Sequence, residues 1–106
     1  MIEALVSTRP CDGDAILVEV RGALDDTAVL SQLRRTLVDV MLHRPAHHVV
    51  IDLVQVTDID GVGIGTVVAG CDALDALGMS VLVRGRAVTL TRLRADGLPQ
   101  ECAPAV

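Results

Sequence analysis

The sequence predicts a single α/β domain with a mixed, mostly parallel β-sheet that opens with a β-hairpin. Three observations lead to this fold class. Strand-like and helix-like segments alternate along the chain after an opening pair of apolar runs. The 106 residues are enough for one hydrophobic core and too few for two. Hydrophobic residues make up 51% of the chain but none is aromatic, so the core must be aliphatic.

The opening hairpin is predicted from two short apolar runs. The first extends from Ile2 to Ser7, and a turn-forming cluster from Arg9 to Asp14 follows it. The second run, from Ala15 to Arg21, is rich in β-branched residues and lies between two glycines. We therefore expect two antiparallel strands joined by a turn.

A helix is predicted from about Thr27 to His43. Asp25 and Asp26 precede it and can cap its free backbone N–H groups, and Pro45 follows it closely. Apolar residues recur on one helical face at the spacing i, i+4, i+8, i+11. They are Val29, Leu33, Leu37 and Val40.

A buried strand and a second helix follow. Residues His48 to Leu53 are almost continuously apolar, as expected for a strand covered on both faces, and a loop is expected after Leu53. The segment Gly63 to Leu77 has helical periodicity, and Gly78 is a typical helix end. The apolar positions of this helix are Ile64, Val67, Val68, Cys71 and Leu74.

The last elements are a strand from Ser80 to Arg84 and a helix from Val88 to Ala95 that Gly97 ends. Right-handed crossovers would connect the parallel strands and pack the helices on the sheet. We expect one domain over residues 1–98 and a loose tail over residues 99–106.

The charges are distributed unevenly. The formal net charge is −5, and residues 45–83 alone hold five Asp and no Arg. An acidic chain without aromatic side chains is unsuited to nucleic acid, whose binding depends on phosphate neutralisation and base stacking. The absence of Lys excludes a Walker A phosphate loop and Schiff-base chemistry. We therefore expect a protein partner with a basic docking surface, bound more weakly at high salt.

Four arginines close to the predicted last helix form a local basic patch. They favour solubility or, as a sharper alternative, a site for an anion or an acidic partner. They are Arg84, Arg86, Arg92 and Arg94.

Neither a membrane location nor a metal site is indicated. The uncharged stretch from Gly61 to Cys71 is too short to span a bilayer, and the N-terminus has no secretory pattern. We expect a cytoplasmic protein without cofactor or metal, since its three cysteines match no metal-binding spacing. Cys71 is predicted to be a core residue, with a redox pairing to Cys102 as a minor alternative.

The segment between the buried strand and the second helix carries most of the functional information. Asp60 occupies the position of a helix N-cap, where its carboxylate would accept the first free N–H groups. Gly61, Gly63 and Gly65 alternate with apolar residues at the start of the helix. Because glycine lowers helix propensity, these positions predict a close approach of the backbone to the sheet or to a partner.

Several enzymatic interpretations compete for this segment. Asp58 and Asp60 imitate the DxD loop of haloacid-dehalogenase-type phosphatases, and Asp52 imitates the phosphoacceptor of a receiver domain. Both of those enzyme types need a Lys that this chain lacks. The glycines after Asp60 also miss the third position of a dinucleotide-binding GxGxxG motif. An Asp-based phosphoryl or metal-dependent enzyme using Asp52, Asp58 and Asp60 remains the alternative from another functional class.

The order Val56-Thr57-x-Ile59-Asp60-x-x-Gly63-Ile64-Gly65 resembles the signature V-T-F-I-D-S-S-G-L-G of STAS domains, the anti-sigma factor antagonists. Three flanking segments also match that family at the right distances. They are Arg21 to Asp25, Val49 to Leu53 and Gly78 to Val83.

The resemblance implies a STAS-like fold and a binding module rather than an enzyme. A typical member docks through its second helix and the preceding loop onto a GHKL-type anti-sigma factor kinase and so frees a sigma factor. The kinase then releases itself by phosphorylating a Ser before the motif glycine. Carried over residue by residue, the predicted partner-binding positions are Asp58, Asp60, Gly61, Val62, Gly63, Thr66 and Asp72.

The sequence departs from the family at the phosphoacceptor. Val62 occupies that position and Gly61 precedes it, so the usual hydroxyl is absent. The nearest hydroxyls belong to Thr57 and Thr66, and Thr66 could serve as a displaced acceptor. We therefore predict a monomeric or weakly dimeric STAS protein that phosphorylation at the usual site does not control.

Two further differences follow from the same resemblance. A typical STAS domain continues past its third helix, whereas this sequence is expected to have a shortened C-terminal end and an uncovered sheet edge. The partner could also be an ABC-type ATPase or a stressosome-like assembly instead of an anti-sigma factor.

Overall fold

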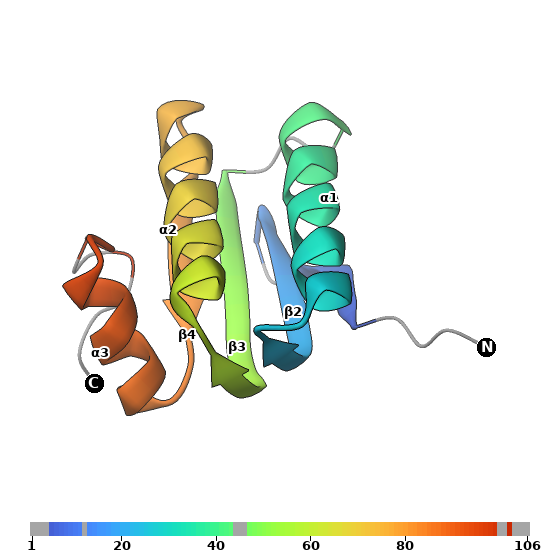
Figure 1. Cartoon of the computed structure of the whole chain (residues 1–106). Helices are drawn as coiled ribbons and strands as arrows, with labels where there is room; N and C mark the ends of the chain where they lie inside the picture. Colours follow the sequence, from blue (N-terminus) through green and yellow to red (C-terminus); the bar gives the residue numbers. More distant parts are fainter. Residues whose placement is uncertain (1–4, 12, 44–46, 100–101, 103–106) are drawn as a thin grey trace.

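Seven elements form a four-stranded sheet with three helices (Figure 1). The computed structural model describes residues 5–11, 13–43, 47–99 and 102. The elements are β1 (Val6–Cys11), β2 (Ala15–Leu24), α1 (Thr27–His43), β3 (His48–Ile59), α2 (Gly61–Ala76), β4 (Ser80–Arg84) and α3 (Ala87–Ala95).

The sheet is mixed and mostly parallel, which confirms the predicted fold class. Its order is β1-β2-β3-β4, and only the hairpin pair β1–β2 is antiparallel. Helices α1 and α2 lie side by side on one face of the sheet, and α3 lies next to α2 beyond β4 (Figure 1). The ends of β3 and the starts of α2 and α3 therefore come together at one edge of the domain.

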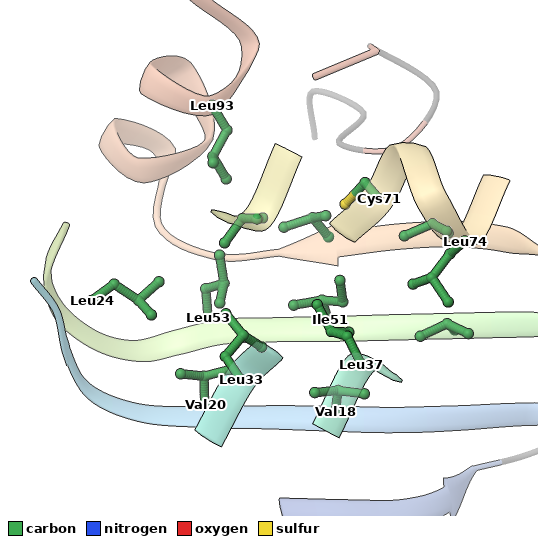
Figure 2. Close-up of a cluster of buried hydrophobic side chains, with 14 of the residues drawn as sticks. Val18, Val20, Leu24, Leu33, Leu37, Ile51, Leu53, Cys71, Leu74 and Leu93 are labelled. Carbon is green, nitrogen blue, oxygen red and sulfur yellow. The ribbon is translucent and has the colours of Figure 1, made fainter. Parts of the chain in front are cut away.

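The core lies between the sheet and helices α1 and α2 (Figure 2). Alternate residues of β2 and β3 point to this side, because successive side chains of a strand point to opposite faces. Leu33 and Leu37 meet them from α1, and Leu74 meets them from α2. The strand side chains that Figure 2 labels in this cluster are Val18, Val20, Leu24, Ile51 and Leu53, all at most 1% exposed.

The first strand differs from the prediction. β1 begins at Val6 and continues to Cys11, through residues expected to form the turn. Pro10 pairs in register with Ile16 although it has no N–H group. Because β1 is an edge strand with only one neighbour, it tolerates a proline that a central strand would exclude.

The third strand is twice as long as the predicted segment. β3 extends to Ile59, so the loop expected after Leu53 is wrong. Its extension pairs with the end of β2, including Leu24 opposite Ile59, after two shifts in register. Of the added residues only Val56 is buried, so they show no regular alternation, and only the long-range pairing with β2 makes them a strand.

Helix α2 begins at Gly61, two residues before its predicted start. Helix α3 begins at Ala87, one residue before its predicted start. In the tail, Cys102 is only 7% exposed, which differs from the expected loose segment. The backbone N–H of Val83 in β4 donates to the Cys102 carbonyl oxygen at 2.6 Å, so this residue covers part of the last sheet edge. Residues 100–101 and 103–106 lie outside the described part of the chain.

No helix within the described ranges is both long and apolar enough to cross a membrane.

Candidate partner-binding surface

The start of α2 is fixed by Asp60 at its N-cap. Asp60 has an extended backbone conformation, and its Oδ1 accepts a hydrogen bond from the Gly63 N–H at 2.8 Å. Its backbone carbonyl accepts the first intrahelical bond, from the Ile64 N–H at 2.9 Å. The carboxylate also lies at the positive end of the helix dipole, which favours its negative charge.

Gly63 is required by a close approach of α2 to β2. A Cβ atom at Gly63 would lie 2.1 Å from the carbonyl oxygen of Leu24, a backbone atom that cannot move aside easily. A Cβ atom at Gly61 or Gly65 would meet nothing within 4 Å. The predicted close approach to the sheet therefore explains only one of the three glycines.

Most predicted partner-binding residues are accessible at this helix start. Val62 is 57% exposed in the first turn of α2, and Asp58, Asp60 and Gly61 are exposed beside it. Gly63 is buried, so it can only support this surface from beneath. Asp72 is exposed on the same helix but lies about 15 Å further along its axis, at 1.5 Å per residue.

Thr66 connects the two helices on this side of the molecule. Its hydroxyl donates to the Val62 carbonyl oxygen at 2.8 Å and accepts from Nη2 of Arg34 in α1 at 3.3 Å. The side chain is half-buried. These two bonds engage the hydroxyl that would have to act as a displaced phosphoacceptor.

An apolar groove between α1 and α2 continues the surface away from Val62. Sequence reasoning did not find it, although small residues recurring along α2 were a signal. At Gly70 a Cβ atom would lie 2.6 Å from Cδ1 of Leu37, so the helices approach closely at its floor. The groove has a volume of about 300 Å³ and is lined by Arg34, Leu37, Val38, Met41, Thr66, Ala69, Gly70 and Ala73.

The sequence profile of the STAS domain matches residues 7–99. The chain belongs to the STAS domain family. No curated protein has a significantly similar sequence.

Solved structures show the same fold. The unphosphorylated form of the anti-sigma factor antagonist SpoIIAA is similar with a TM-score of 0.69 at 14% identity, over 87% of this chain and 83% of that chain. The phosphorylated form of the Bacillus cell fate determinant SpoIIAA gives 0.67 at 16% identity, over 88% and 84%. A crystal structure of Mglu gives 0.63 at 24% identity over 77% of this chain, which spans only 19% of the Mglu chain.

Within this STAS domain, Asp52 lies far from Asp58, although both were proposed for one enzymatic site. Asp52 and Asp58 are six residues apart on the extended strand β3, which corresponds to about 20 Å at 3.3 Å per residue. Asp52 accepts the Val54 N–H at 3.0 Å, whereas Asp60 caps α2. In the part of the chain that the structure describes, no three His, Cys, Asp or Glu residues are grouped to hold a metal ion.

The two cysteines of the redox alternative are both buried, and neither forms a disulfide. Burial raises the pKa of the Cys71 thiol from 9.0 to about 12, and Cys102 and Asp72 add to this by charge repulsion. A thiol with so high a pKa stays protonated at neutral pH and is a poor nucleophile. Cys71 contributes to the hydrophobic core, as its place in the helical pattern indicated.

Proposed function

We propose that this STAS domain is an anti-sigma factor antagonist, which binds a GHKL-type, kinase-like anti-sigma factor in the cytoplasm and thereby frees a sigma factor. The observation that carries the proposal is the exposed Val62 beside the Asp60-capped start of α2, within the family motif. The fold shared with SpoIIAA, itself an anti-sigma factor antagonist, supports the same function.

The docking surface combines one apolar anchor with several carboxylates. Val62 supplies the anchor, and Asp58, Asp60 and Asp72 supply negative charge with no Arg between residues 45 and 83. An apolar side chain with carboxylates on the same side of the molecule suits a partner with an apolar pocket and a basic rim. The domain acts here by binding and needs no catalytic group of its own.

Control of this complex does not use the usual phosphorylation switch. Val62 occupies the acceptor position and has no hydroxyl, and Gly61 before it has none either. The relative concentrations and affinities of antagonist, anti-sigma factor and sigma factor then decide how much sigma factor is free. SpoIIAA, which has the same fold, exists in phosphorylated and unphosphorylated forms. The missing hydroxyl therefore distinguishes the proposed control of this protein from that of SpoIIAA.

The function is tested with a preformed complex of anti-sigma factor and sigma factor. The protein is first used as bait in a lysate of its own organism, and the captured protein is identified by mass spectrometry. Adding purified STAS domain to the captured anti-sigma factor bound to its sigma factor should release the sigma factor in proportion to the amount added. Capture of an ABC-type ATPase or a stressosome-like assembly, with no release of any sigma factor, would favour the alternative partner.

The absence of a phosphorylation switch is tested on the same reconstituted proteins. Incubation with the anti-sigma factor, Mg²⁺ and ATP should leave the intact mass of the STAS domain unchanged. A stoichiometric phosphate on Thr57 or Thr66 would show that a displaced hydroxyl has taken over the switch.

A further inference from the structure

A second hollow lies where α3 begins, against the last residues of β3, and it does not include the start of α2. Its volume is about 180 Å³. Because one water molecule occupies about 30 Å³ in the liquid, the hollow has room for a small tetrahedral oxyanion. Its polar lining comes from Thr57 and Asp58 of β3 and from Arg86, Thr89 and Arg92.

Two guanidinium groups are held at this hollow by the backbone of β3. Nη2 of Arg86 donates to the Val56 carbonyl oxygen and lies 3.4 Å from that of Thr57. Nη1 of Arg92 donates to the carbonyl oxygen of Ile59. Since each guanidinium carries five N–H donors, these contacts leave other donors of both groups for a ligand. The two positive charges are therefore oriented before any ligand arrives.

The side chain of Thr89 adds a hydroxyl group to the lining of the hollow. Thr89 is only 5% exposed and lines the hollow, and its hydroxyl has no hydrogen-bond partner among the described residues. No described side-chain polar atom that is fully buried lacks a hydrogen-bond partner, so the Thr89 hydroxyl keeps some contact with solvent. A ligand oxygen bound in the hollow would accept a hydrogen bond from this hydroxyl in place of a solvent molecule.

The first turn of α3 adds unpaired backbone donors. The Leu90 N–H makes the first intrahelical bond, to the Arg86 carbonyl oxygen at 3.0 Å. The N–H groups of Ala87, Val88 and Thr89 precede that bond, and Arg86 at the N-cap makes no side-chain cap. Free N–H groups at a helix start favour a bound anion.

We propose that this hollow binds a tetrahedral oxyanion, either a free phosphate-like ion or the phosphoryl group of a small organic ligand, between Arg86, Arg92 and Thr89. The carboxylate of Asp58 also lines the hollow and repels an anion, so it lowers the affinity of the site. Asp58 also belongs to the proposed docking surface, but neither guanidinium does, so phosphate binding can be measured on the protein without any anti-sigma factor.

The proposal is tested by NMR titration of the ¹⁵N-labelled protein with inorganic phosphate at constant ionic strength. Saturable shifts are expected for the backbone amides of Val88 and Thr89 and for the side-chain N–H groups of both arginines. A parallel titration with methyl phosphate distinguishes the two sources, since tighter binding of the ester would assign a phosphoryl group and tighter binding of phosphate a free ion. Sodium chloride at matched ionic strength should produce no saturable shift.

Three variants test the assignment. Arg92→Gln should weaken phosphate binding about tenfold, which corresponds to about 1.4 kcal/mol. The control Arg84→Gln removes the same charge outside the hollow and should change the affinity by no more than about twofold. Asp58→Asn should tighten binding, because it removes the one negative charge from the lining.

Thr89→Val is a further variant, because Arg92 also ties α3 to β3 and its replacement could loosen the helix. This change keeps the shape of the side chain and removes only the hydroxyl, so it should weaken phosphate binding while the spectrum outside the hollow stays that of the wild type. Shifts that do not saturate, that chloride reproduces, or that persist unchanged in both Arg92→Gln and Thr89→Val would overturn the proposal.

Discussion

The starts of α2 and α3 are two helix N-termini beside the same end of β3, and they carry opposite charge. At α2 a carboxylate from Asp60 caps the helix, and the exposed Val62 follows in the first turn. At α3 the N-cap is Arg86 without a side-chain cap, and its guanidinium donates to β3 carbonyls instead. The exposed apolar residue of that first turn is Val88.

The contrast shows how one local geometry can serve two ligands. At α2 the Asp60 carboxylate binds the Gly63 N–H and brings negative charge to the helix start, so this start offers carboxylates and an apolar side chain to a basic protein surface. An uncapped start retains its N–H groups and, with two guanidinium groups nearby, suits an anion.

The largest change in stability is expected from a substitution at Gly63, where α2 packs closely against β2. Gly63→Ala would place a Cβ atom 2.1 Å from the Leu24 carbonyl oxygen. Forcing the helix away should lower the free energy of unfolding by about 3 kcal/mol, at the upper end of ordinary overpacking costs. By the usual scaling, this lowers Tm by at least about 12 °C, which differential scanning calorimetry measures directly.

Gly65→Ala is the matched control, since its Cβ atom would meet nothing within 4 Å. Here the better helix propensity of Ala should raise the free energy of unfolding by about 0.5 to 1 kcal/mol. Equal destabilisation by both substitutions would contradict the specific contact between Gly63 and β2.

A smaller effect is expected from the cap of α2. Asp60→Ala removes the acceptor of the Gly63 N–H and should lower the free energy of unfolding by about 1 kcal/mol. Asp58→Ala removes the same charge from a neighbouring exposed position and should change it by no more than about 0.5 kcal/mol. Urea titration followed by circular dichroism compares the two, and a larger loss for Asp58→Ala would refute the capping role.

Much of the fold could be predicted because local patterns determine it. The bounds of α1 and β4 agree with the predicted ones. Apolar periodicity with Asp26 before it and Pro45 after it marks α1, and Gly78 and Gly85 lie on either side of β4. The extension of β3 could not be predicted, because its residues become a strand only by pairing with Arg21 to Leu24 in β2. Long-range pairing leaves no local signal in sequence.

The two ligand surfaces also combine features that local sequence determines with features that only the fold determines. The N-cap role of Asp60 follows from a residue type and its neighbours, so the sequence indicated it. Gly63 cannot carry a side chain because a carbonyl group of β2 lies against it, whereas Gly65 has no such neighbour. No sequence pattern near the two glycines reveals this difference. The basic patch could be predicted from the arginines in the sequence. Only the fold shows that Arg86 and Arg92 line the hollow and that Arg84 does not.

The most direct test of the central claim, that the start of α2 is the docking surface, compares two exposed valines. Val62 is 57% exposed at the start of α2 and Val88 is 66% exposed at the start of α3. Each is replaced by Asp, and the Kd for the captured anti-sigma factor is measured by isothermal titration calorimetry at low and high salt. We predict that Val62→Asp weakens binding at least about thirtyfold, the factor for a 2 kcal/mol anchor residue, and that Val88→Asp leaves Kd unchanged. Wild-type affinity should also fall as salt increases. An equal affinity of both variants at either salt concentration would contradict the proposed docking surface.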